Sequence, residues 1–183
     1  MRRDVVEAAQ NGDHEAFEVL ATGVGDRLFA IAFLITRDRQ RAEDAVQETL
    51  VHAWRELPGL RDPDRLDAWL YRLVVNACAD EGRRQRRWSA EVRMIRSEPT
   101  TEDGARSLAD RDQLERGFRR LKPEQRAVVV LHFYAGLPVP DIAETLGVPA
   151  GTVKSRLHYA TETLRAALEA DARVGAVANG RTA

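Results

Sequence analysis

Apolar residues recur along most of this chain at intervals of three and four, the spacing of an amphipathic α-helix. No segment alternates with the period of two that a half-buried β-strand requires. We therefore expect an all-α protein. The pattern predicts helices over residues 4–21 with a break at 11–13, then 27–35, 39–57, from about 63 into an arginine-rich stretch, 108–121, 124–135 and 140–168 with a turn inside it.

Breaks in this pattern divide the chain into two small helical bundles joined by a flexible linker. Residues 97–104 (SEPTTEDG) are polar, acidic and rich in helix breakers, which is typical of a linker. We expect a first domain over residues 4–96, a linker over 97–107 and a second domain over 108–170. The last residues, 171–183, show no hydrophobic period and are expected to be a disordered tail.

The second domain ends in a pattern typical of a DNA-binding helix-turn-helix. Ile142, Ala143 and Leu146 form the apolar stripe of a short helix, and Gly147 follows where a helix commonly ends in a left-handed residue. A longer helix then restarts near Gly151. Its inward positions are Val153, Leu157, Ala160, Leu164 and Leu168. Its outward and flanking positions are Thr152, Lys154, Ser155, Arg156, His158 and Tyr159. Such short polar and cationic side chains suit a DNA groove, although an ordinary helical hairpin has the same outline.

Two further polar faces lie on predicted helices of the first domain. Residues 39–57 carry a mostly acidic stripe opposite their apolar face, made of Asp44, Gln47, Glu48, Val51 and Arg55. The following helix gathers Arg72, Asn76, Asp80, Arg83 and Arg87 on one face. Each stripe has the simple alternative of a solvated helix surface.

Six arginines against one acid between residues 83 and 96 form a basic stretch that predicts phosphate binding. Trp88 within this stretch is a candidate for stacking on an unpaired base. The net charge of −1 over 183 residues requires any DNA-binding surface to be local.

Composition argues against several other classes of protein. The single cysteine, Cys78, excludes an internal disulfide and is expected to be a buried apolar residue. Four scattered histidines form no metal or catalytic motif, so we expect no enzyme activity, metal or cofactor. The longest uncharged run, residues 127–140, is shorter than the roughly 20 residues of a membrane span. A soluble, cytoplasmic protein is expected.

Three segments resemble sigma factors of the bacterial sigma-70 family, in particular its extracytoplasmic-function (ECF) branch. They are AEDAVQETLVHAW at 42–54, DAWLYRLVVNACADEGRRQRR at 67–87, and the helix-turn-helix with GTVKSRL at 151–157. They occur in the family's order and spacing. The resemblance implies a dissociable subunit of RNA polymerase that gives promoter specificity, with no further C-terminal domain.

The resemblance also implies roles for particular residues. Docking on core RNA polymerase, at the β′ clamp helices with the β subunit as a further contact, would fall to Asp44, Gln47, Glu48 and Val51. Recognition of the −10 promoter element would fall to Arg61, Arg72, Asn76, Asp80, Arg83, Arg84 and Arg87, beside a loop at 57–64 that holds an extruded base. Recognition of the −35 element would fall to Thr152, Lys154, Ser155, Arg156, His158 and Tyr159. An inhibitory anti-sigma protein is the expected further partner.

Three positions depart from the family pattern. Pro138 stands where a capping serine is usual, while Tyr159 and Thr161 replace common arginines. These changes affect the expected −35 preference rather than the fold. The alternative function is a stand-alone helix-turn-helix regulator whose first domain senses a signal or dimerises. That protein would not need the acidic stripe.

Overall fold

The computed structural model describes the backbone of residues 3–95 and 109–179, and the side chains of residues 3–84 and 115–169. Every regular element in these ranges is helical, which confirms the all-α prediction. The α-helices are α1 Arg3–Gln10, α2 His14–Thr36, α3 Arg39–Glu56, α4 Leu66–Ile95, α5 Ala109–Arg120, α6 Pro123–Val129, α7 Val139–Leu146 and α8 Ala150–Asn179. Two 3₁₀ turns, η1 Leu57–Gly59 and η2 Pro63–Arg65, lie between α3 and α4, and a π-helical turn, η3 Val130–Tyr134, follows α6.

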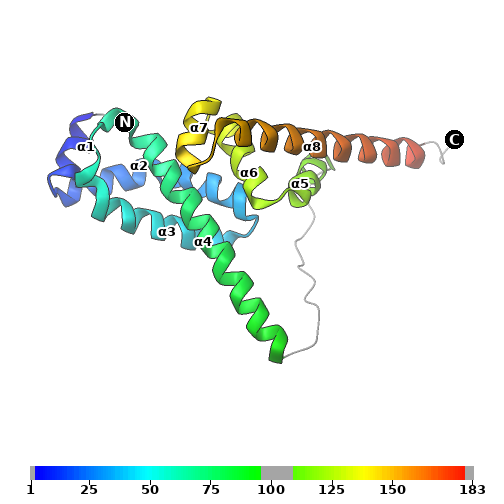
Figure 1. Cartoon of the computed structure of the whole chain (residues 1–183), viewed down its shortest axis with the longest axis horizontal. Helices are drawn as coiled ribbons and strands as arrows, with labels where there is room; N and C mark the ends of the chain where they lie inside the picture. The colour runs from blue at the N-terminus through cyan, green and yellow to red at the C-terminus, as the bar shows by residue number, and fades with distance from the viewer. Residues whose placement is uncertain (1–2, 96–108, 180–183) are drawn as a thin grey trace.

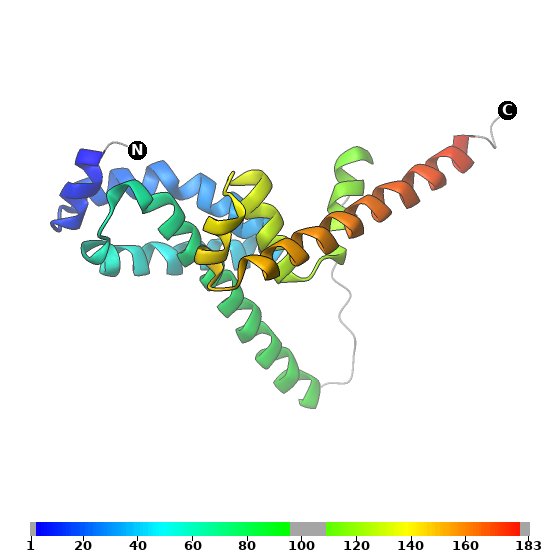
Figure 2. The ribbon, with the colours of Figure 1, turned by 45° about the horizontal axis from the view of Figure 1, so that its top comes forward.

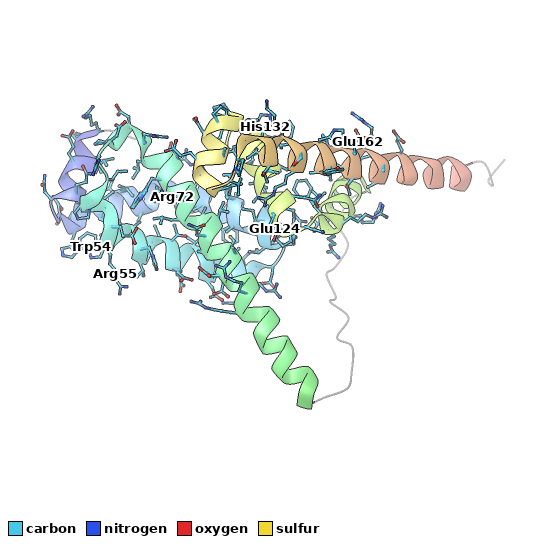
Figure 3. All side chains as sticks on the ribbon, in the orientation of Figure 1. Trp54, Arg55, Arg72, Glu124, His132 and Glu162 are labelled. Carbon is cyan, nitrogen blue, oxygen red and sulfur yellow. The ribbon has the colours of Figure 1, made fainter. Side chains whose placement is uncertain are left out.

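Helices α1 to α4 form the first bundle, which Figure 1 shows on the side of the N-terminus. Its core contains fully buried residues from α2, including Leu20, Leu28 and Ile31, together with Leu70 and Val74 of α4. Trp54 of α3, labelled in Figure 3, packs its ring 4.9 Å from Phe17 and 4.5 Å from His14, between ring centroids. The apolar faces predicted from the sequence therefore do face one another.

Aspartate side chains cap the helix starts in this bundle. The Asp13 side chain accepts a hydrogen bond from the Ala16 amide at 3.1 Å, and Asp38 accepts one from the Arg41 amide at 2.9 Å. Each carboxylate satisfies an amide that the first helical turn leaves without a partner. Asp62 does the same for Asp64 at the start of η2. These local signals fix where α2, α3 and η2 begin.

Cys78 lies inside the first bundle, as predicted. Its side chain is buried, and this burial raises the pKa of the thiol to about 12. The thiol therefore stays protonated near neutral pH and is a poor nucleophile. Cys78 acts as a small apolar residue of the core.

Helices α5 to α8 form the second bundle. Leu121, Val129 and Ala160 are buried together, with Phe118, Leu157 and Leu164 packed against them. Gly117 permits α5 to approach α8 closely, because a Cβ at this position would meet Leu164 Cδ2 at 2.9 Å. Gly147 ends α7 with φ 62°, the left-handed conformation that the sequence predicts there.

Helix boundaries differ from the expectations in three places. The helices predicted over 4–21 and 27–35 are continuous as α2 from His14, because its buried residues hold Gly23 and Gly25 within the helix despite their low helix propensity. The helix predicted over 124–135 changes to the π-helical turn η3 at Val130. The expected linker over 97–107 lies in the part of the chain outside the described residues.

The third difference is the C-terminal tail. Residues 171–179, expected to be disordered, continue α8 as far as Asn179. Three alanines and no proline occur in this stretch, so helix propensity outweighs the missing hydrophobic period. Figure 2 shows α8 projecting well beyond the two bundles.

Helix α2 is long and apolar enough to cross a membrane by length and composition. It nevertheless contributes six buried residues to the helical core, among them Val24, Ala32 and Ile35. An apolar helix packed by its neighbours in this way has the role of a core helix. We therefore assign α2 to the core of the first bundle.

The two bundles pack directly against each other. Leu131 of η3, Ile142 of α7 and Val153 of α8 belong to the same hydrophobic cluster as Leu28 and Val74 of the first bundle. Helix α7 contacts α4, and α6 and η3 contact α2. Both views show α7 beside the N-terminal half of α4 (Figures 1 and 2). The described chain is thus in a closed arrangement.

Candidate nucleic-acid interface

Helices α7 and α8 form the predicted helix-turn-helix, and α8 is its candidate reading helix. Val153 and Ala160 are fully buried on its inner side. The predicted outer residues divide into two groups by exposure. Lys154, Ser155, His158 and Tyr159 are exposed, whereas Thr152 and Arg156 are partly buried. Tyr159 leaves 63% of its surface exposed, and the centroid of its ring lies 5.6 Å from that of His158.

The start of α7 lacks a side-chain cap, as the proline at position 138 predicts. Pro138 occupies the N-cap position and makes no capping hydrogen bond. Pro140 lies within the first turn, where the missing amide costs little. The Ile142 amide still donates to the Pro138 carbonyl at 3.1 Å, so the first turn closes without the usual serine.

Helices α3 and α4 form a polar groove of about 570 Å³ in the first bundle. Four of the predicted −10 residues line it from α4, namely Arg72, Asn76, Asp80 and Arg83. Glu48 and His52 line it from α3. Arg72 lies on the N-terminal half of α4, where Figure 3 labels it. The groove therefore brings one predicted −10 face next to the predicted docking stripe.

Ion pairs in and beside this groove partly neutralise its charge. Arg83 Nε donates to Asp80 Oδ1 at 3.0 Å. Arg84 pairs with Glu81 at 2.5 Å and with Glu48 at 3.5 Å, and these carboxylates raise its pKa, the hydrogen bond to Glu81 most. Arg84 therefore faces α3 rather than the other predicted −10 residues. Arg72 is exposed.

The remaining predicted −10 residues do not line this groove. Arg61 is exposed in the loop between η1 and η2. The side chain of Arg87 lies outside the described residues, as do the side chains of Trp88 and of the rest of the basic stretch. The groove thus accounts for a subset of the predicted set.

The residues of the docking stripe on α3 differ in how far they are exposed to solvent. Asp44 and Glu48 are partly buried, while Gln47 is exposed and Val51 leaves 47% of its surface exposed. Asp44 accepts a hydrogen bond from Gln40 at 3.1 Å. An exposed valine flanked by acids is a surface on which a partner can gain both apolar burial and charge contacts.

Sequence reasoning missed a second group of residues, located where the bundles meet. Arg65 of η2 donates to Glu144 of α7 at 2.7 Å, although 79 positions separate them. Arg126 of α6 has a buried Nε without a hydrogen-bond partner, and desolvation lowers its pKa. No periodic pattern could have found either, because both depend on how the bundles pack.

A helix-turn-helix preceded by a helical bundle with a polar groove and an acidic stripe defines a DNA-binding protein with a further partner surface. Comparison with known proteins gives the family. Residues 20–88 match the family Sigma-70 region 2, and residues 111–164 match the family Sigma-70, region 4.

Individual relatives agree with this match. The ECF RNA polymerase sigma factor SigL of Mycobacterium tuberculosis is 37% identical over 146 residues, covering 78% of this chain and 82% of SigL. SigW of Bacillus subtilis is 26% identical, covering 87% of this chain and 92% of SigW. The chain belongs to the ECF branch of the sigma-70 family.

Two solved structures share the fold over most of the chain. The sigma factor RpoE of Bartonella quintana, in complex with the anti-sigma factor NepR, has a TM-score of 0.69 and 26% identity, and the match covers 84% of this chain and 96% of RpoE. CnrH in complex with the cytosolic domain of CnrY has a TM-score of 0.65 and 29% identity, covering 92% and 97%.

Proposed function

We propose that this ECF sigma factor works through three separate surfaces of the described chain. As a sigma factor, the protein binds core RNA polymerase, directs it to promoters and supports transcription initiation. The residues that perform each of these tasks are our assignment. The carrying observation is the groove between α3 and α4, which gathers four promoter-recognition candidates beside the acidic stripe.

Docking on core RNA polymerase is assigned to Asp44, Gln47, Glu48 and Val51 of α3, with the β′ clamp helices as the partner surface and the β subunit as a further contact. The exposed apolar side chain of Val51 supports this assignment, since a solvated helix face gains nothing from it. A positively charged partner surface would complement Asp44 and Glu48.

Recognition of the −10 element is assigned to the α3–α4 groove and its neighbouring loop. Arg72 and Arg83 supply cations for backbone phosphates, while Asn76 and Asp80 supply the donors and acceptors that can read a base edge. Arg61, Arg84 and Arg87 complete the proposed set. A polar groove of this size suits a single strand better than a duplex.

Recognition of the −35 element is assigned to the outer face of α8. Arg156 is the candidate for a bidentate contact to guanine, and Lys154 is the candidate phosphate contact. Thr152, Ser155, His158 and Tyr159 supply further hydrogen bonds or stacking. Four residues of this face, Lys154, Ser155, His158 and Tyr159, are exposed and carry hydrogen-bond donors.

Regulation by an anti-sigma protein is a further part of the proposal. Two structural neighbours are sigma factors bound to CnrY and to the anti-sigma factor NepR, respectively. The family consists of transcription initiation factors, and we assign this chain no enzymatic activity and a cytoplasmic location beside the polymerase. The alternative of a stand-alone helix-turn-helix regulator is not favoured, because both sigma-70 regions match in order.

Site-specific cross-linking in holoenzyme tests these assignments. Photoreactive groups would be attached to Asn76→Cys on α4 and to Ser155→Cys on α8, with Glu18→Cys on α2 as the control. Native Cys78 does not interfere, because it is buried and protonated. Position 76 is expected to cross-link near −10 and position 155 near −35, with none from position 18. Cross-links from positions 76 and 155 to the same promoter element would contradict the proposal.

A further inference from the structure

The closed arrangement places part of the second bundle at one edge of the proposed −10 surface, beside Arg72. Pairing of the two bundles uses apolar residues of α7 and η3, including Ile142 and Leu131, in one core with Val74 of α4. The contact therefore brings α7, the first helix of the helix-turn-helix, onto the N-terminal half of α4. What lies at the edge of this contact is polar.

Arg65 and Glu144 form an ion pair at that edge. Arg65 donates to the Glu144 carboxylate at 2.7 Å, and both side chains keep more than half of their surface exposed. The hydrogen bond from Arg65 is the largest cause of the lowered pKa of Glu144, and the charge of Arg72 lowers it further. The Glu144 carboxylate thus lies in the field of two guanidinium groups from the first bundle.

These groups surround a small cavity of about 140 Å³ that belongs to both bundles. Leu60, Arg65, Trp69 and Arg72 line it from the loop and α4, and Glu144 and Thr145 close it from α7. Arg72 belongs to the proposed −10 set, and Leu60 to the loop assigned to an extruded base. Guanidinium groups bind carboxylate and phosphate oxygens with the same geometry. Glu144 is therefore placed as a phosphate would be.

The same closure also engages the candidate −35 reader. Arg156 of α8 lines a cavity of about 380 Å³ between the bundles, together with Asn76 and Arg83 of α4. A cavity of this volume accommodates a small molecule rather than a DNA duplex. Residues assigned to two promoter elements that lie apart on the DNA thus line one cavity, so the closed chain cannot contact both elements at once.

We propose that Arg65 is a further promoter-phosphate ligand, and that Glu144 occupies it in the free chain as an internal competitor of DNA. This inference rests on the proposed −10 surface. Docking on the polymerase would separate α7 from α4 and free Arg65 and Arg72 for the DNA strand. Because the ion pair is exposed, it adds little to the hold between the bundles, which the shared apolar core provides. Its effect is to exclude the DNA strand.

Charge reversal tests the inference on the free, full-length chain. Glu144→Arg would remove the carboxylate from Arg65 and place a third cation beside Arg65 and Arg72. Glu7→Arg is the matched control, since Glu7 is an exposed partner of Arg3 on α1 and the change in net charge is the same. Two quantities are measured: the radius of gyration without DNA, and affinity for a single-stranded oligonucleotide carrying a mapped −10 element.

We expect Glu144→Arg to bind the oligonucleotide at least tenfold more tightly than Glu7→Arg, with a similar radius of gyration because the shared apolar core still holds the bundles together. Adding Arg65→Ala to Glu144→Arg should remove most of the gain, whereas adding Arg39→Ala, an exposed arginine of α3 paired with Glu43, should not. Equal affinity of the two charge reversals for the oligonucleotide would overturn the inference and leave the proposed function intact. An enlarged chain with no gain in affinity would overturn the −10 surface itself.

Discussion

Reversing two acids of α3, as Asp44→Lys with Glu48→Lys, is expected to abolish binding of the chain to core RNA polymerase. Both side chains are partly buried beside the exposed Val51, so the reversal places two cations where a basic partner surface is proposed to dock. Like charges brought together in an interface cost several kcal/mol. Co-purification with core polymerase measures the loss.

Folding stability must be measured on the same variant. Glu48 pairs only loosely with Arg84, at 3.5 Å, and an exposed pair of this kind contributes about 0–1 kcal/mol to the free energy of unfolding. The variant is therefore expected to stay folded. Glu15→Lys with Glu18→Lys, two exposed positions of α2, is the control with the same change in charge. A folded Asp44→Lys, Glu48→Lys protein that still binds core as the control does would contradict the docking assignment.

Two substitutions in α8 are expected to have different effects, one on promoter preference and the other on the overall strength of binding. Arg156→Ala should remove preference at one −35 position, because a bidentate contact to guanine is worth about 1–3 kcal/mol of discrimination. Lys154→Ala should weaken binding to all promoters alike. It should also make the slope of log affinity against log salt concentration shallower by about one, as the loss of one phosphate contact predicts. The exposed position of Lys154 and the partly buried position of Arg156 support this division.

Promoter competition with holoenzyme at two salt concentrations separates these effects. The competing promoters should differ only in the −35 element, so that any change in ranking comes from α8. If Arg156→Ala leaves the ranking of promoters unchanged, α8 does not read the −35 element through this residue. A change in ranking with Lys154→Ala would show instead that Lys154 contacts a base.

Local signals in the sequence predicted much of the fold. Asp13 and Asp38 cap their helices, and Gly147 adopts the left-handed conformation, because each depends on only a few neighbouring residues. The apolar faces of α3 and α4 were likewise predicted, since a helical period alone defines them. Cys78 is buried as its neighbours indicated.

Features that depend on tertiary packing were not predicted. The continuity of α2 through Gly23 and Gly25 results from the packing of one buried face, which outweighs the low helix propensity of glycine. No pattern in the sequence indicates the π-helical turn η3. The closed arrangement is the largest omission, because the contact of Arg65 with Glu144 joins positions that no local pattern relates.

The candidate site was predicted in part for the same reason. The helical period predicted that one face of α4 carries Arg72, Asn76, Asp80 and Arg83. These four residues do line one groove. The resemblance also grouped Arg84 with them, but Arg84 faces Glu48 and Glu81. Arg65 was missed because it stands outside the helix period, in the 3₁₀ turn before α4.

Run-off transcription with purified core RNA polymerase tests the central claim most directly. Core polymerase alone, core with this chain, and core with the Asp44→Lys, Glu48→Lys variant would be compared on a library of promoter fragments. The account predicts discrete transcripts only with the unaltered chain, all starting downstream of a shared pair of −35 and −10 sequences. Transcripts that are the same with and without the chain, across the whole library, would contradict it.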